Sequence, residues 1–142
     1  MNFIKACCLS VLLLAVPACS MVSSLTAGPQ AFPPLDPGKG RVFLYRGSTF
    51  GSENMPDVLL NGEKVGKLDR SSVLFRDVLP GSYAVTTTMT SRVAHFAVGA
   101  GEKKYVKFDN SMLGAHTYPE LVDSARGESE SANLSLMNKG GK

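Results

Sequence analysis

Asp57-Val-Leu-Leu-Asn-Gly-Glu-Lys-Val-Gly-Lys-Leu68 is the stretch that decides the fold class. Two runs of β-type residues, 57–60 and 63–68, lie on either side of Asn61-Gly62. Asn-Gly between such runs is the strongest short signal of a β-hairpin, because both turn residues must adopt positive φ. The stretch therefore predicts two antiparallel strands joined by a two-residue turn.

Short β-type runs continue on both sides of this hairpin. Upstream, Arg41-Val-Phe-Leu-Tyr-Arg46 has apolar residues on both faces, which predicts a strand covered from two sides. Downstream runs are separated by turn residues such as Pro80-Gly81 and cover residues 72–76, 82–90, 92–98 and 103–109. Six or seven close-spaced strands predict an all-β fold, a small antiparallel β-sandwich of immunoglobulin- or prealbumin-like type.

The C-terminal region has a weaker pattern. Residues 118–123 are compatible with an edge segment, in which Pro119 limits pairing. Residues 124–137 predict a short helix or an irregular tail, because Gly127 and several serines oppose a stable helix. The sandwich is therefore expected over 41–137, followed by a disordered tail at 138–142.

The N-terminus has the organisation of a secretory signal. Lys5 precedes an apolar core of about a dozen residues, which is too short to cross a bilayer comfortably. Val16-Pro-Ala-Cys19 follows it and resembles the bacterial lipobox, with Val16 and Pro17 as departures from the usual pattern. The resemblance implies a signal peptide at 1–18, cleavage between Ala18 and Cys19, and a Cys19 carrying diacylglycerol and a further acyl chain such as palmitate.

Two alternatives remain open for this segment. One is an ordinary secretory signal cleaved after Ala18, and the other is an uncleaved anchor. The cysteine count favours lipidation, because Cys7 and Cys8 leave with the signal and only Cys19 remains. A free thiol in an oxidising compartment would be a liability, and no intramolecular disulfide is possible in the processed chain.

Residues 19–40 predict a tether rich in Pro and Gly. About 20 residues of flexible linker give a mean reach of roughly 25 Å. Ser20, not Asp, follows Cys19. By resemblance to sorted lipoproteins, this favours the outer membrane, with the domain facing the periplasm.

The order of several segments resembles one known family. These segments are Gly40–Arg46, Val58–Leu68, Leu79–Val85, Ala100–Phe108 and Pro119–Asp123. They resemble the bacterial lipoproteins grouped as domain of unknown function 2846, with Asn-Gly and Pro-Gly turns like those of PEGA modules. The resemblance implies a β-sandwich on a lipid anchor, and it implies no activity, cofactor or catalytic residue.

Composition and motifs argue against several functions. The chain has 142 residues and a formal net charge of +3, with no basic stripe, so no nucleic-acid partner is expected. His95 and His116 lack further ligands at a workable spacing, so no metal is expected. No G-x-S-x-G nucleophile motif occurs, and the protein is predicted not to be an enzyme.

Two surface features are candidate partner contacts. Phe50 lies in a long polar loop over 47–55. Lys103, Tyr105 and Lys107 share the presumed outer face of one strand. This face could contact an anionic glycan or lipid headgroup, or it could be a solvated strand face with a half-buried tyrosine, which is the commoner case.

Three functions follow from these observations. The first is a non-enzymatic envelope lipoprotein that binds the membrane through its anchor and presents loops to an envelope protein or cell-wall partner. The second is a small-ligand or glycan-binding module that uses Phe50 and Tyr105. The third and least favoured is a hydrolase centred on one of the two histidines.

Overall fold

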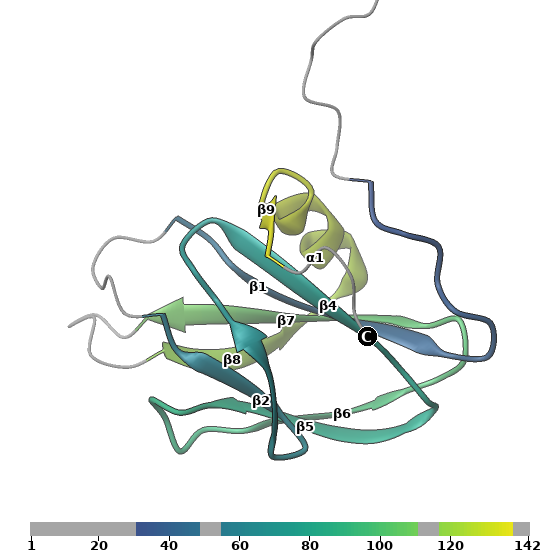
Figure 1. Ribbon diagram of the computed structural model, residues 1–142, viewed down its shortest axis with the longest axis horizontal. Helices are drawn as coiled ribbons and strands as arrows, with labels where there is room; N and C mark the ends of the chain where they lie inside the picture. The colour runs from purple at the N-terminus through teal and green to yellow at the C-terminus, as the bar shows by residue number, and fades with distance from the viewer. Residues whose placement is uncertain (1–30, 49–54, 111–116, 138–142) are drawn as a thin grey trace, which may run out of the picture.

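The computed structural model describes residues 31–48, 55–110 and 117–137 (Figure 1). These residues form strands and one short helix, in the order β1 (Gly40–Arg46), β2 (Asp57–Leu60), β3 (Glu63–Lys67), β4 (Ser72–Val78), β5 (Gly81–Thr87), β6 (Ala94–Val98), β7 (Lys103–Asn110), β8 (Thr117–Val122), α1 (Ser124–Ser131) and β9 (Ser135–Leu136).

The strands make two facing sheets, which confirms the predicted all-β sandwich. One sheet has five strands in the order β8-β7-β1-β4-β9, and the other has four in the order β3-β2-β5-β6. Most pairs are antiparallel, as expected. The pairs β1–β7 and β4–β9 are parallel, which departs from the predicted antiparallel arrangement. Parallel neighbours are distant in sequence, so no turn motif announces them.

The Asn61-Gly62 hairpin forms as predicted. Asn61 has a φ of 49° and Gly62 a φ of 82°, the two positive values that a tight hairpin turn requires. Strands β2 and β3 pair antiparallel on either side of this turn, with a register shift between Val58 and Leu59. This hairpin supplies half of the four-stranded sheet.

Strand β1 lies in the middle of the five-stranded sheet and is buried along its whole length. Val42 and Leu44 face the other sheet and belong to the main core, whereas Phe43 and Tyr45 belong to a second cluster. The two-sided burial predicted from the sequence is therefore confirmed. Residues of the main core come from both sheets and include Val58, Leu68, Leu74, Val85, Phe96, Val106 and Phe108.

The second cluster, here called the outer cluster, consists of Phe43, Tyr45, Val73, Phe75 and Tyr105. Helix α1 lies over the five-stranded sheet on the side away from β2, β5 and β6, and Leu134 and Leu136, at the edge strand β9, also pack on the outer cluster (Figure 1). Tyr105 is stacked on Phe43, with ring centroids 4.7 Å apart. The molecule thus has a third layer above the sandwich.

Residues 32–39 were expected to belong to the tether, but the first of them, Phe32, packs on this outer cluster. The Phe32 ring packs edge-on to Phe43 at 4.9 Å and to Phe75 at 5.9 Å between centroids. The connection between Cys19 and the folded domain therefore contains fewer residues than the predicted tether, 19–40.

The C-terminal helix is also shorter than the predicted span of 124–137. The Asp123 side chain caps α1 by accepting a hydrogen bond from the Arg126 amide at 2.9 Å, and the helix ends at Ser131. Ser135 and Leu136 then pair with β4 as the short strand β9. Pairing with a distant strand outweighs the weak local helix preference here.

Gly127 lets α1 approach β7 closely. A Cβ atom at this position would lie 2.2 Å from Cγ of Tyr105, well inside van der Waals contact. In a free helix, alanine in place of glycine stabilises by about 1 kcal/mol. Here the loss of fit should outweigh that gain.

We therefore predict that Gly127→Ala lowers the free energy of unfolding by about 1–3 kcal/mol, because the helix must move off Tyr105. Urea unfolding followed by circular dichroism measures this change. Gly47→Ala is the matched control, since no atom lies within 4 Å of the added Cβ. A Gly127→Ala protein as stable as wild type would contradict the tight packing.

Candidate functional site

Arg41 and Asp77 form a short, largely buried ion pair. They lie opposite each other on β1 and β4. Nε of Arg41 donates to Oδ1 of Asp77 at 2.6 Å, and Nη2 donates to Oδ2 at 2.8 Å. This is the bidentate geometry that a planar guanidinium and a carboxylate prefer.

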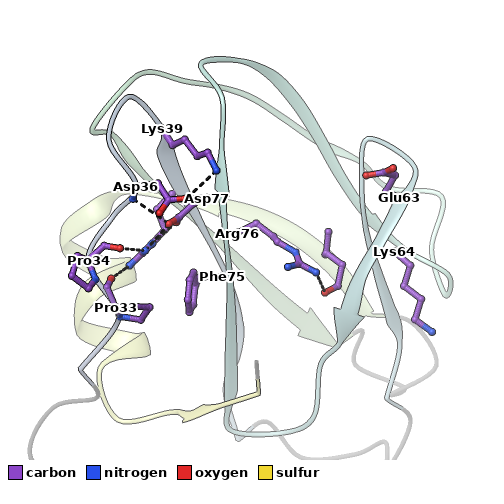
Figure 2. Close-up of a pocket in the computed structure, with 11 residues that line it drawn as sticks. Pro33, Pro34, Asp36, Lys39, Glu63, Lys64, Phe75, Arg76 and Asp77 are labelled. Atoms are coloured by element: carbon purple, nitrogen blue, oxygen red, sulfur yellow. Dashed lines mark hydrogen bonds and ion pairs between the residues drawn. The ribbon is translucent and has the colours of Figure 1, made fainter. Parts of the chain in front are cut away.

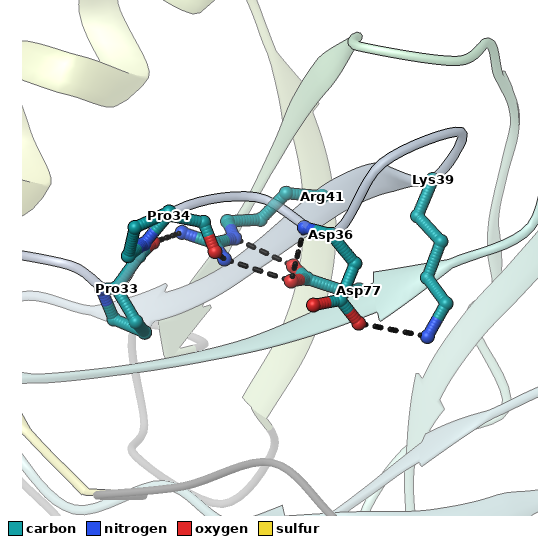
Figure 3. A network of polar contacts seen from close by, with 6 residues as sticks. All are labelled: Pro33, Pro34, Asp36, Lys39, Arg41 and Asp77. Atoms are coloured by element: carbon teal, nitrogen blue, oxygen red, sulfur yellow. Dashed lines mark hydrogen bonds and ion pairs between the residues drawn. The ribbon is translucent and has the colours of Figure 1, made fainter.

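The same guanidinium also holds the N-terminal segment. Nη1 donates to the carbonyl oxygen of Pro33 at 2.6 Å, and Nη2 donates to that of Pro34 at 3.1 Å (Figure 3). The Arg41 guanidinium lies 4.4 Å from the centroid of the Phe75 ring. Arg41 is only 4% exposed, so its charge is stabilised by these partners and not by bulk water.

We call Arg41, Asp77, Pro33 and Pro34 the arginine clasp. The hydrogen bonds from Arg41 hold the pKa of the Asp77 carboxyl below its usual value. The Asp36 amide adds a long contact to Asp77 at 3.5 Å, and Lys39 pairs with Asp36 at 2.9 Å. The clasp therefore fastens residues 33–39 to the end of β4.

A groove of about 580 Å³ runs beside the clasp, between the N-terminal segment and β3 (Figure 2). Its wall includes both cations and anions, and two pairs form within it, Arg41 with Asp77 and Lys39 with Asp36. Lys64 pairs with Asp57 at 2.9 Å, and Nη2 of Arg76 donates to the carbonyl oxygen of Val65 at 3.2 Å. The groove is therefore poorly suited to a strongly charged ligand.

A second polar network joins α1 to the five-stranded sheet. The buried Tyr45 hydroxyl donates to Oε2 of Glu130 at 2.8 Å. Lys107 lies 3.3 Å from the same oxygen, and Nε of Arg126 donates to Oε1 at 2.9 Å. Three donors thus converge on one carboxylate at the edge of a shallow hollow of about 570 Å³.

This network shifts the ionisation of its members. The hydrogen bond from Arg126, with those from Tyr45 and Lys107, lowers the pKa of Glu130 to about 2. Burial, followed by the bond to Glu130, raises the pKa of Tyr45 above its ordinary value. Tyr45 is therefore a protonated donor at neutral pH, and the network acts as a brace between helix and sheet.

The face of β7 that was predicted to contact a partner is partly covered in the structure. Lys103, Tyr105 and Lys107 do share the outer face of β7, but α1 covers the middle of it. Tyr105 is only 3% exposed, so it is not available to a partner. Lys107 is engaged with Glu130 and Asp109, whereas Lys103 is half exposed and makes a long pair with Glu128 at 3.5 Å.

Other predicted sites fall outside the described residues. These are Ala18, Cys19, Phe50 and His116. His95 is exposed on β6. Within residues 31–48, 55–110 and 117–137, no cluster of three or more His, Cys, Asp or Glu side chains could hold a metal ion. The same residues contain no helix that is both long and apolar enough to span a membrane.

The comparison with known families adds one finding. A family model described as "Protein of unknown function (DUF2846)" matches residues 36–120. The chain belongs to the DUF2846 family. The match covers β1 to most of β8, including Arg41 and Asp77, and it ends before α1. No curated protein and no solved structure matched the chain.

Membership in DUF2846 confirms the resemblance seen in the sequence, but not its PEGA-like character, which stays a prediction. Sequence reasoning missed the arginine clasp of this DUF2846 protein. The available signal was Arg41 at the start of a strand buried on both sides, with Pro33-Pro34 just upstream. A charged residue in such a strand needs dedicated partners.

We predict that Arg41→Lys destabilises the protein by about 2 kcal/mol or more, because lysine cannot donate to Asp77 and to both prolyl carbonyls at once. Urea unfolding gives the free energy, and the rate of tryptic cleavage after Lys39 reports release of the segment. Arg70→Lys, at an exposed position, is the control. Unchanged stability and cleavage in Arg41→Lys would contradict the clasp.

Glu130 gives a pH-dependent prediction. Its folded pKa of about 2 lies below the ordinary value of roughly 4.3 in the unfolded chain. The carboxylate therefore contributes stability above about pH 4.3, and this contribution is lost as the pH falls toward 2. We expect Glu130→Gln to be less stable than wild type at pH 7 and to lose less stability than wild type over this acid range.

Unfolding in urea at several pH values measures this dependence. Ser129→Ala is the control, because it alters an exposed residue of the same helix without changing charge. Parallel stability curves for wild type and Glu130→Gln would show that the carboxylate is not held by these donors.

Proposed function

We propose that this DUF2846 protein is a lipid-anchored, non-enzymatic module of the bacterial cell envelope. The anchor is Cys19, which follows a secretory signal in a lipobox-like sequence. Ser20 favours transfer to the outer membrane with the domain in the periplasm. The partner is an envelope protein or a cell-wall component.

The observation that carries the proposal is the arginine clasp. Two consecutive carbonyl groups, from Pro33 and Pro34, are bound by a buried guanidinium on β1. The domain therefore binds its own N-terminal segment a short distance beyond Cys19. Such a grip suits a protein held at its N-terminus, because a pull on the anchor is carried to the central strand of the five-stranded sheet.

The proposed absence of catalysis agrees with the chemistry of the two polar networks. In each of them, both carboxylate oxygens already accept hydrogen bonds from neighbouring side chains. A general base or nucleophile needs a free lone pair beside a space that substrate can enter. Asp77 and Glu130 are instead arranged as structural partners of Arg41 and Tyr45.

Intact-mass analysis of membrane-extracted protein tests the anchor. We expect a mature protein that begins at Cys19 and carries the mass of diacylglycerol and an acyl group. It should stay in the membrane fraction, because two or three acyl chains bind a membrane almost permanently. Cys19→Ala should lose this mass and move from the membrane to the soluble fraction. Cys8→Ala, inside the signal, should behave as wild type.

A mature chain that starts at another residue, or that carries an unmodified Cys19 thiol, would contradict the proposal. So would a Cys19→Ala protein that stays in the membrane fraction to the same extent as wild type.

A further inference from the structure

The N-terminal segment leaves the domain at one particular face. Phe32 packs on the outer cluster, and Leu134 and Leu136 pack on the same cluster. The chain enters on the side of the five-stranded sheet that α1 covers (Figure 1). Because the clasp binds the next two residues, this exit point is fixed relative to the sheets.

The connection between Cys19 and this exit point is short. Twelve residues, 20–31, separate Cys19 from Phe32. A flexible chain of that length has a mean reach of roughly 20 Å and a fully extended length of about 45 Å. The reach is less than the one that the sequence alone suggests, because the clasp and Phe32 hold residues 32–39 against the domain.

The size of the domain, compared with the length of this connection, restricts how the domain can be oriented on the membrane. A domain of about 110 residues has a radius of roughly 17 Å, given a radius of gyration of about 13 Å. To place the opposite face on the membrane, the connection must pass around the domain. It must follow a quarter of the circumference and then descend by one radius, a path of roughly 45 Å by the same dimensions. Only a fully extended chain covers that path.

We propose that the face formed by α1, β9 and Phe32, here called the helix face, lies against the membrane surface in the anchored protein. The outer face of the four-stranded sheet, with His95 and Ala97 of β6, then points away from the membrane. This inference rests on the proposed lipid anchor at Cys19.

The helix face has little electrostatic attraction of its own for a lipid surface. Its charged side chains lie in opposite pairs: Lys103 with Glu128, and Arg126 with Glu120 and Glu130. No cationic patch for anionic headgroups remains among these residues. The tether therefore sets the orientation, and the domain without its lipid should not bind vesicles.

Two single-cysteine labels test the orientation on the full lipidated chain. Asn133→Cys places an exposed label on the helix face, in the turn between α1 and β9. Ala97→Cys places an exposed label on β6, on the opposite side. Lipidated Cys19 cannot react with the dye. The proteins are inserted into phosphatidylethanolamine–phosphatidylglycerol vesicles that contain spin-labelled lipid, which quenches nearby fluorescence.

We expect quenching at position 133 to exceed quenching at position 97 by about threefold or more, because the two labels lie on opposite sides of a domain about 34 Å across. Equal quenching at both positions, or stronger quenching at 97, would overturn the orientation. A label at 133 that is shielded from iodide in soluble Cys19→Ala protein would also overturn it, because a second copy of the chain would then cover the helix face.

The mass of the same labelled proteins separates this inference from the proposed function. An unmodified Cys19 overturns both. A lipidated Cys19 with equal quenching at the two positions overturns the orientation alone and leaves the anchor in place.

Discussion

Strand β1 is buried on both faces and yet carries the Arg41 guanidinium near its start, and this combination determines much of the structure. The apolar side chains of β1 need cover on two sides, which the four-stranded sheet provides on one side and α1, β9 and Phe32 on the other. Arg41 needs hydrogen-bond partners in a place that water hardly reaches. Asp77 and two prolyl carbonyls supply them, so the N-terminal segment becomes part of the fold.

The third layer is held by close approach as much as by apolar area. Gly127 allows the α1 backbone to rest on Tyr105, and Tyr105 in turn stacks on Phe43 of β1. Glu130 of α1 then accepts a hydrogen bond from the hydroxyl of Tyr45, which also lies on β1. A helix of eight residues would be marginal by itself in water, so its stability here comes from these contacts with the sheet.

The sequence predicts the sandwich well because its signals are local. Asn61-Gly62 and the alternation in β6 and β7 are each read within a few residues. The parallel pairs β1–β7 and β4–β9 join segments far apart in the chain, and no short pattern encodes them. The alternation of side chains along β7 also places Tyr105 on the outer face, but it does not indicate that a helix covers this face. The Arg41–Asp77 pair links positions 36 residues apart, so only the folded register brings them together.

The clasp recognises the backbone of the N-terminal segment, not its side chains. Arg41 binds the carbonyl groups of Pro33 and Pro34, which any residue could offer. Proline fixes φ and also restricts the residue before it, so two successive prolines hold the segment extended before it docks. Less conformational entropy is then lost when the carbonyls meet the guanidinium. The requirement at positions 33 and 34 is therefore one of conformation, whereas the requirement at Arg41 and Asp77 is one of charge and planar geometry.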